Sequence, residues 1–277
     1  MQGKHVLITG GNSGIGLVAA TELARQGATV VLACRASEKT EAALTQINTV
    51  AGTPAVNLPV DLANLGQVKE LAANYCNRYT QLDVLINNAG IFPAKQRLTD
   101  DGFEMQIGVN HLAHFLLTHE LLDLLKQSAP ARVINVSSKL HTKGAIDFDS
   151  FKGFEKYSPQ VAYNQSKLAN LLFSVELAKR LAGTGVTSNC LHPGAVATDV
   201  VREMPWLIRK LLGLMFIAPE TGAQTTIMLA THPDLAETTG KYYDQCELTS
   251  YSELGNDTTL RERLWQWSAK ATSADVQ

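Results

Sequence analysis

The chain has 277 residues, with 24 Lys and Arg against 26 Asp and Glu, a formal net charge of -2, and 45% hydrophobic residues. This length and apolar content suffice for one large domain with a sizeable core. Nucleic-acid binding requires a basic excess that this charge balance lacks, so we expect no nucleic-acid partner. The cysteines lie far apart without metal-ligand spacing, and the first apolar run is too short for targeting or membrane crossing. We therefore expect no metal, no transmembrane segment and a cytoplasmic location.

Short β-branched runs alternate with longer helical patterns along most of the chain. The predicted strands are residues 5–9, 29–34, 55–60, 84–87, 132–136 and 186–191, and the predicted helices are residues 15–25, 38–50, 67–78, 103–126 and 162–181. Because the strands are apolar almost throughout, we expect a parallel sheet with helices on both faces. The fold class is therefore α/β, as a single doubly wound Rossmann domain over residues 1–277. Two excursions interrupt it, at residues 139–160 and 199–219.

A glycine-rich loop directly follows the first predicted strand and opens a helix. Its glycines allow the backbone to approach a pyrophosphate, and the helix N-terminus adds N–H donors and partial positive charge. Such a loop can also be a plain tight turn, but the strand before it, the helix after it and the repeating pattern beyond favour a dinucleotide site. The candidate contacts are Gly10, Asn12, Ser13, Gly14, Ile15 and Gly16.

The end of the second predicted strand indicates which dinucleotide binds. NAD sites usually carry an acidic residue there for the ribose 2′-hydroxyl, whereas this chain has Cys34 and Arg35, with Lys39 one turn later. A guanidinium can hold a 2′-phosphate through paired hydrogen bonds, and an acid would repel it. NADP(H) is therefore the predicted cofactor, with Arg35 and Lys39 among its contacts. The alternative is that both residues are solvated surface cations.

Tyr163 and Lys167 lie four residues apart in a strongly helical stretch, which places both on one helix face. A tyrosine ordinarily has a pKa of about 10, so it needs a nearby positive charge to exchange protons near neutrality. Lys167 can provide that charge. By itself such a pair is more often part of a solvated helix face.

Together these motifs resemble the short-chain dehydrogenase/reductase family over nearly the whole chain. The family's T-G-x-x-x-G-x-G loop matches residues 9–16, N-N-A-G matches residues 87–90, and Y-x-x-x-K matches residues 163–167. The resemblance also implies a catalytic serine at Ser138 and a helical asparagine at Asn110. It implies that Tyr163 exchanges a proton with the substrate oxygen, that Ser138 polarises this oxygen, and that Lys167 holds the nicotinamide ribose. Asn110 would anchor a water in the proton relay.

The resemblance implies further cofactor contacts, beyond the carboxyl ends of the strands where open α/β sheets bind ligands. These are Asp61, Leu62, Asn88, Ala89, Gly90, Tyr163, Lys167, Pro193, Gly194, Val196 and Thr198. His111 and His114 have a spacing that could suggest a metal pair, but no acidic or thiol partner is suitably spaced.

The stretch between Ser138 and Tyr163 is longer than in many family members and, with the flanking motifs, resembles the retinol dehydrogenase and protochlorophyllide reductase branch. This resemblance implies a lipophilic aldehyde, ketone or alcohol as substrate. Residues 199–219 are rich in large apolar side chains interrupted by basic ones, and we predict that they form a substrate lid. Plain packing or subunit contact, and peripheral membrane association, remain open alternatives for this segment.

The predicted helices at residues 103–126 and 162–181 carry more apolar residues than one buried face needs, and family members commonly dimerise through them, so a homodimer is also predicted. The predicted function is hydride transfer between NADP(H) and a carbonyl or alcohol carbon, with carbonyl reduction as the expected direction. A nonenzymatic NADP-binding redox sensor or scaffold is the alternative from another class. A methyltransferase on the same fold would explain the glycine loop but not the other motifs.

Overall fold

The computed structural model describes residues 1–194 and 217–274. They form an eight-stranded sheet in the order β3-β2-β1-β4-β5-β6-β7-β8, in which only the last pair is antiparallel. The strands are β1 (His5–Thr9), β2 (Thr29–Cys34), β3 (Val56–Pro59), β4 (Val84–Asn87), β5 (Ala131–Val136), β6 (Val186–His192), β7 (Tyr242–Asp244) and β8 (Glu247–Thr249). The order reverses between β1 and β4, which creates the crevice where such sheets bind ligands.

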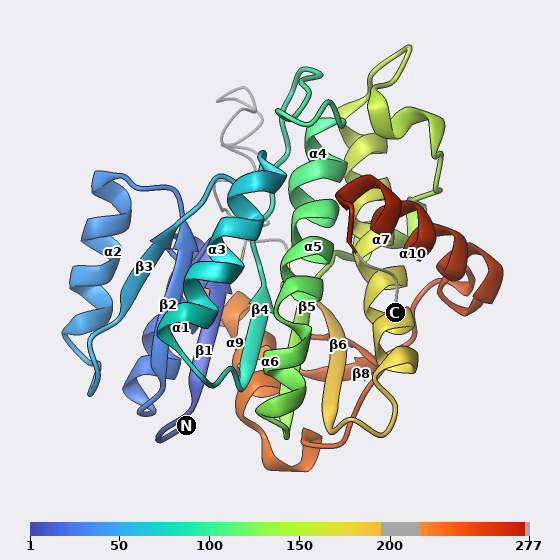
Figure 1. The fold of residues 1–277 in the computed structure, drawn as a ribbon. Helices are drawn as coiled ribbons and strands as arrows, with labels where there is room; N and C mark the ends of the chain where they lie inside the picture. Colours follow the sequence, from blue (N-terminus) through green and yellow to red (C-terminus); the bar gives the residue numbers. More distant parts are fainter. Residues whose placement is uncertain (195–216, 275–277) are drawn as a thin grey trace.

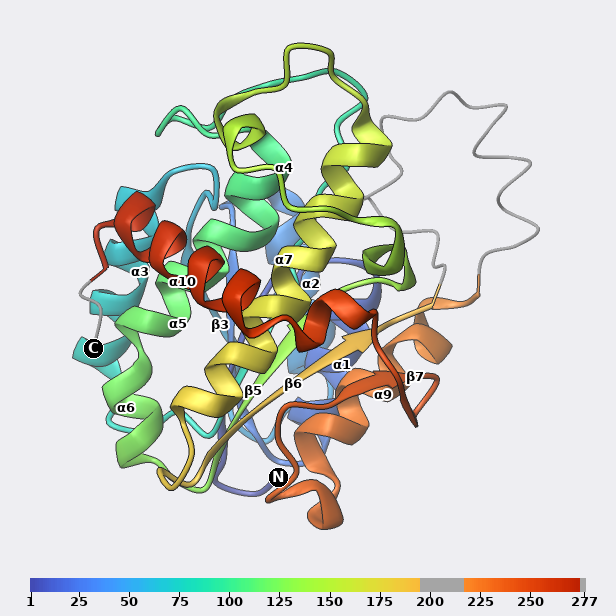
Figure 2. The same cartoon turned by 90° about the vertical axis from the view of Figure 1, so that its right-hand side faces the viewer.

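Helices cover both faces of the sheet, as predicted (Figure 1 and Figure 2). They are α1 (Gly14–Arg25), α2 (Glu38–Asn48), α3 (Leu65–Arg78), α4 (Met105–Ile107), α5 (Ala113–Glu120), α6 (Leu122–Gln127), α7 (Pro159–Arg180), α9 (Pro219–Thr231) and α10 (Thr258–Thr272). One buried apolar layer joins the sheet to α3, α5, α7 and α10, and the other joins it to α1, α2 and α9. The central strands are therefore apolar on both sides, which explains their nearly continuous hydrophobic sequences.

The prediction of one continuous helix over residues 103–126 is wrong. It consists of α4, a π-helical turn η1 (Gly108–Leu112), α5 and α6 in succession. A π-turn inserts one extra residue into a helix without changing its apolar character, so hydrophobic periodicity does not reveal it. The turn contains Asn110, and π-turns frequently occur at functional sites.

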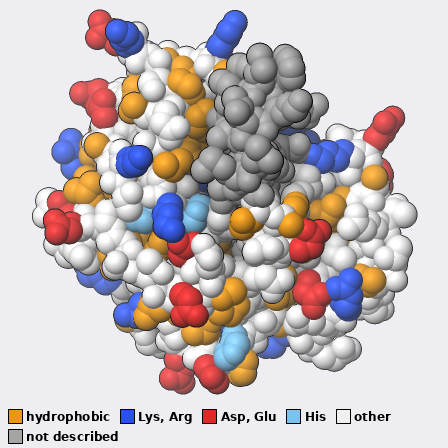
Figure 3. Space-filling view, turned by 180° about the vertical axis from the view of Figure 1, so that it is seen from behind, with side chains coloured by type: hydrophobic (Ala, Val, Ile, Leu, Met, Phe, Trp, Pro, Cys, Tyr) orange, Lys and Arg blue, Asp and Glu red, His pale blue; other side chains and the backbone are white. Residues whose placement is uncertain are grey.

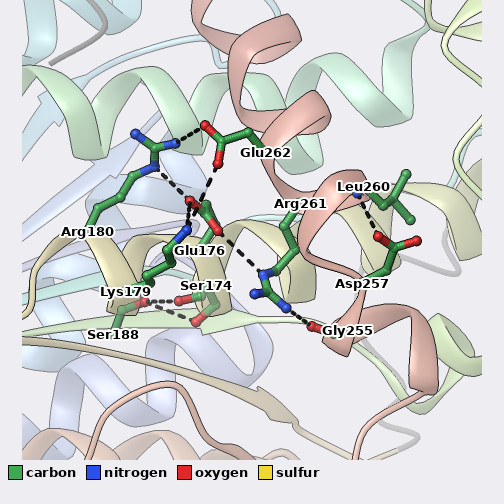
Figure 4. Close-up of polar contacts among 10 residues, drawn as sticks. All are labelled: Ser174, Glu176, Lys179, Arg180, Ser188, Gly255, Asp257, Leu260, Arg261 and Glu262. Carbon is green, nitrogen blue, oxygen red and sulfur yellow. Dashed lines mark hydrogen bonds and ion pairs between the residues drawn. The ribbon is translucent and has the colours of Figure 1, made fainter.

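The C-terminal part adds elements that were not predicted, namely β7, β8, α9 and α10. Helix α10 lies across α5 and α7, where Trp265 packs against Phe115 and Phe173 at ring-centroid distances of 5.0 and 5.9 Å. A buried ion pair between Glu176 of α7 and Arg261 of α10 joins the same helices (Figure 4). Helix α10 thus covers the apolar surface of α5 and α7 that suggested a homodimer. The homodimer stays a prediction, and it would need another surface.

The inserted segment 139–160 contains short 3-10 turns, η2 (Lys139–Lys143) and η3 (Asp149–Lys152), and it packs beside the loop that follows β4. Phe154 N donates to Gln96 Oε1 at 2.6 Å, and the Tyr157 hydroxyl donates to the Pro93 carbonyl at 2.9 Å. The two loops therefore lie together beyond the carboxyl ends of the strands, at the top of Figure 1. Of the predicted lid, residues 199–216 lie outside the described residues, and Pro219 already begins α9.

Charged side chains of both signs are interspersed over the face drawn in Figure 3, and its coloured part carries no continuous basic patch. None of the helices in residues 1–194 and 217–274 combines the length and the apolar character that crossing a bilayer demands.

Candidate active site

The glycine loop between β1 and α1 is folded tightly against the turn that follows β4. Gly10 and Gly14 have positive φ values of 65° and 51°, a conformation that favours glycine. A Cβ atom at Gly16 would collide with the Gly10 carbonyl and with Asn88 Nδ2. Asn88 Nδ2 donates to the Thr9 carbonyl at 2.8 Å and to the Gly10 carbonyl at 3.3 Å. The first turn of α1 carries no acidic residue, so its positive end fits the pyrophosphate of a dinucleotide.

The loop is linked to the end of β2, where the ribose of a dinucleotide would lie. Asn12 Nδ2 donates to Thr40 Oγ1 at 2.9 Å, and the Thr40 hydroxyl donates to the Arg35 carbonyl at 2.7 Å. Burial raises the pKa of the Cys34 thiol to about 11, so this thiol is neutral near pH 7. The end of β2 therefore carries no negative charge, and the exposed side chains of Arg35 and Lys39 follow it.

The predicted catalytic side chains come together at the carboxyl end of β5. Ser138 is the second residue after β5, and its side chain interacts with Tyr163, on α7, closely enough to lower the pKa of the Tyr163 hydroxyl. Lys167 Nζ lies 5.6 Å from the centre of the Tyr163 ring and donates to the Val136 carbonyl at 3.0 Å. Burial raises the pKa of Tyr163 to about 12, which the interaction with Ser138 partly offsets, and burial lowers the pKa of Lys167 to about 8. Near pH 7 the Tyr163 phenol is therefore neutral, while Lys167 still carries most of its positive charge.

Asn110 adjoins this set but turns its side chain toward the backbone of Ile91. Its Oδ1 accepts from Ile91 N at 2.8 Å, and its Nδ2 donates to the Ile91 carbonyl at 3.2 Å and to Ser166 Oγ at 3.0 Å. A Cβ atom on Gly90 would lie 3.4 Å from Lys167 Nζ and 3.7 Å from Asn110 Oδ1. Asn110 thus fastens the loop after β4 to α7 beside Lys167, and its predicted part in a proton relay stays a prediction.

The remaining predicted cofactor contacts fall at the same edge of the sheet. Asp61 and Leu62 follow β3, Asn88, Ala89 and Gly90 follow β4, and Pro193 and Gly194 follow β6. Val196 and Thr198 lie outside the described residues. His111 and His114, considered above as a metal pair, contact different groups: His111 Nε2 lies 2.9 Å from Ser268 Oγ, and His114 Nε2 lies 2.9 Å from Thr9 Oγ1. No cluster of three or more His, Cys, Asp or Glu side chains suited to a metal occurs within residues 1–194 and 217–274.

The structure also brings residues to the site that sequence reasoning missed. The Phe92 ring meets the Tyr163 ring edge to face at a centroid distance of 5.2 Å. His141 lies beside Ser138, with its Nδ1 2.7 Å from the Ser138 carbonyl oxygen and its Nε2 accepting from Ser252 N at 3.2 Å. The position of Phe92, two residues after the N-N-A-G turn, could have indicated that it lies at the site. The position of His141, three residues after Ser138, was the corresponding indication.

Comparison with known proteins agrees with this geometry. Residues 4–205 match the short chain dehydrogenase family. The chain is 43% identical to human retinol dehydrogenase 14, over 97% of this chain and 86% of that protein, and 44% identical to human retinol dehydrogenase 13, over 99% and 86%.

Solved structures of the same fold include an uncharacterized protein from Mycobacterium paratuberculosis, with a TM-score of 0.81 and 35% identity, covering 100% of this chain and 96% of that one. They also include a Pseudomonas aeruginosa RhlG/NADP active-site complex, with a TM-score of 0.72 and 27% identity over 88% of this chain and 95% of that one. With the matched motifs placed around one site, the chain belongs to the short-chain dehydrogenase/reductase family, in its retinol dehydrogenase-like branch.

Proposed function

We propose that this oxidoreductase uses NADPH to reduce a lipophilic, retinal-like aldehyde or ketone to the alcohol. The observation that carries the proposal is the Tyr163 phenol, which lies beside the Ser138 side chain and beside buried Lys167. The Tyr163 phenol can donate a proton to a carbonyl oxygen that becomes an alcohol, and the Ser138 hydroxyl can donate a hydrogen bond to the same oxygen.

The chemistry balances with groups of this chain and one nicotinamide, which when bound in its reduced form supplies the hydride for the carbonyl carbon. Tyr163 donates its proton to the substrate oxygen, and the Ser138 hydroxyl stabilises the negative charge that develops there. Because burial raises the pKa of Tyr163 to about 12, the phenol holds its proton at neutral pH. That protonation state suits an acid, which favours the direction of reduction.

The preference for NADP(H) is supported by the end of β2. A neutral Cys34 thiol stands where an acid would select NAD, and Arg35 is held next to the phosphate loop through Thr40 and Asn12. The Pseudomonas aeruginosa relative was solved with NADP.

The preference for lipophilic substrates is supported by the aromatic surroundings of Tyr163. Phe92 packs edge to face on its ring, and the Phe154 and Tyr157 rings lie 6.0 Å apart in the neighbouring inserted segment. Apolar walls around a few polar groups are typical of sites for small apolar molecules. The relatives named retinol dehydrogenases agree with such a substrate class.

The proposal is tested by following the decrease in NADPH absorbance during incubation with a panel of aliphatic, aromatic and apocarotenoid aldehydes. The wild-type chain, Tyr163→Phe and Tyr79→Phe are compared. Tyr79 packs against His5 and Tyr75, away from the site, and serves as the matched control. We expect turnover by the wild type and by Tyr79→Phe, and a loss of about 10³-fold in Tyr163→Phe. NADPH binding without turnover on the whole panel would instead favour a sensor or scaffold.

A further inference from the structure

His114, on α5, bridges the phosphate loop and the π-turn that carries Asn110. Its Nε2 lies 2.9 Å from Thr9 Oγ1, at the end of β1, and its Nδ1 lies 3.0 Å from the Asn110 carbonyl oxygen. Only 1% of His114 is exposed. The imidazole therefore joins two parts of the active site that are about a hundred residues apart in sequence.

Counting hydrogen bonds fixes the proton on this ring. The Asn110 carbonyl can only accept, so Nδ1 must carry the hydrogen. Thr9 Oγ1 already accepts from Asn88 N at 2.9 Å and from Ala89 N at 3.0 Å, which uses both of its lone pairs. The Thr9 hydroxyl hydrogen must then point outward, and Nε2 is a closer acceptor than the Ile86 carbonyl at 3.4 Å.

The ring is consequently a neutral imidazole with hydrogen on Nδ1 and a lone pair on Nε2. Burial agrees with this state, because it lowers the pKa of His114 to about 4. A second ring proton would meet a threonine oxygen that has no lone pair left. His114 thus serves as a donor at one end and an acceptor at the other.

We propose that His114 is a positioning residue for the reaction, with a separate task at each ring nitrogen. Through Nε2 it holds the Thr9 hydroxyl so that this oxygen keeps the amides of Asn88 and Ala89, and with them the cofactor turn after β4, against the phosphate loop. Through Nδ1–H it holds the Asn110 carbonyl, and so the π-turn whose side chain fastens Ile91 and Ser166 beside Lys167.

The two tasks predict two different losses. Freeing Thr9 loosens the turn that contacts the dinucleotide, which weakens dinucleotide binding. Freeing the Asn110 carbonyl loosens the support of Lys167 and Ile91, which lowers the turnover rate once substrates are bound. If His114 only filled space, its replacement would not change dinucleotide binding and turnover rate independently of each other.

Paired variants test this separation. His114→Asn keeps an N–H donor near the position of Nδ1 but leaves Thr9 without its acceptor, and His114→Gln keeps an acceptor near Nε2 but leaves the Asn110 carbonyl without its donor. His119→Asn and His119→Gln, at a partly exposed histidine of the same helix, are the matched controls. Dissociation constants for NADPH and NADH are measured by nicotinamide fluorescence, kcat and KM by turnover, melting temperatures by circular dichroism, and the tautomer by ¹⁵N NMR of the ring.

We expect the Nδ1–H tautomer, about tenfold weaker dinucleotide binding in His114→Asn with kcat within about twofold, and the reverse pattern in His114→Gln. An Nε2–H tautomer would overturn the proposal. The proposal would also be overturned if the variants had lower melting temperatures but wild-type dissociation constants and kcat when folded. A parallel loss of dinucleotide binding and kcat in both variants would overturn it as well. The kcat arm rests on the proposed function; the tautomer and the dissociation constants do not, and they decide the proposal even if no aldehyde of the panel is reduced.

Discussion

The carboxylate of Glu176, on α7, pairs with the guanidinium of Arg261, on α10, and only 1% and 9% of these side chains are exposed (Figure 4). Arg180 Nε lies 3.0 Å from the other carboxylate oxygen, and Arg261 Nη1 donates to the Gly255 carbonyl. Removing one member of a buried pair leaves the other charge without compensation. The pair therefore fixes α10 on the apolar face that α5 and α7 would otherwise expose.

We predict that Glu176→Gln lowers the free energy of unfolding by about 3 kcal/mol or more. Glu262→Gln is the matched control, because Glu262 also contacts Arg180 but 45% of its side chain is exposed, and its loss should cost about 1 kcal/mol or less. Urea unfolding followed by circular dichroism measures both. Equal, small losses in the two variants would mean that the buried pair does not hold α10.

Acid should destabilise the protein, because burial lowers the pKa of His111 to about 3 and those of His114 and His192 to about 4. The unfolded chain then binds more protons than the folded chain below the ordinary histidine pKa of about 6.5, so stability is complete above that pH and falls as the pH drops toward 4. The loss by pH 5 is about 2 kcal/mol for each histidine. Burial raises the pKa of Glu104, so protonation of this one carboxyl in acid favours the folded state and opposes the effect of the histidines.

Urea unfolding between pH 7 and pH 4.5 measures the slope, with His111→Gln as the comparison. That variant removes one of the histidines whose pKa burial lowers, so its unfolding free energy should depend less steeply on pH than that of the wild type. Identical slopes would show that His111 does not titrate as its burial requires.

Cofactor preference should depend on Arg35. Arg35→Glu places a carboxylate where the 2′-phosphate of NADP would lie, so we expect the KM for NADPH to rise by at least about tenfold while that for NADH changes by less than about threefold. Steady-state kinetics with each cofactor measure this, and Lys270→Glu, an exposed charge reversal on α10, is the control. Equal losses with the two cofactors would show that Arg35 does not distinguish them.

Much of this site follows from sequence because its parts lie in short motifs next to strong secondary-structure signals. The apolar runs ending at Thr9 and at Val136 marked strand ends; the glycine loop follows the first directly, and Ser138 is the second residue after the other. Four-residue spacing placed Tyr163 and Lys167 on one helix face, which the structure confirms. Local patterns therefore determined both the fold class and the placement of these side chains.

Contacts between residues distant in sequence could not be predicted in this way. The bond between Thr9 and His114 spans 105 positions, and the packing of Trp265 on Phe115 depends on how the C-terminal segment folds back. The π-turn at Asn110 changes helix geometry by one residue, which is too little to disturb an apolar pattern. These features arise from tertiary packing rather than from local preference.

Substrate preference should depend on Phe92, whose ring packs on the ring of Tyr163, the proposed proton donor. Phe92→Ala removes apolar contact area, so the KM for an apocarotenoid aldehyde should rise by about tenfold while that for a short, water-soluble aldehyde changes by less than about threefold. Steady-state kinetics with the two aldehydes under NADPH saturation measure the difference. Parallel changes for both would place Phe92 outside the lipophilic part of the site.

Isotope transfer shows whether hydride passes directly from the nicotinamide to the carbonyl carbon, with Tyr163 as the proton donor. NADPH deuterated at one or the other C4 position of the nicotinamide is incubated with the wild-type chain and a reducible aldehyde, and the alcohol is analysed by mass spectrometry. We predict that the alcohol gains one deuterium at the former carbonyl carbon from one C4 position only, and that Tyr163→Phe forms almost no labelled alcohol. An alcohol without deuterium from either position would exclude direct hydride transfer, and undiminished labelling in Tyr163→Phe would exclude Tyr163 as the proton donor.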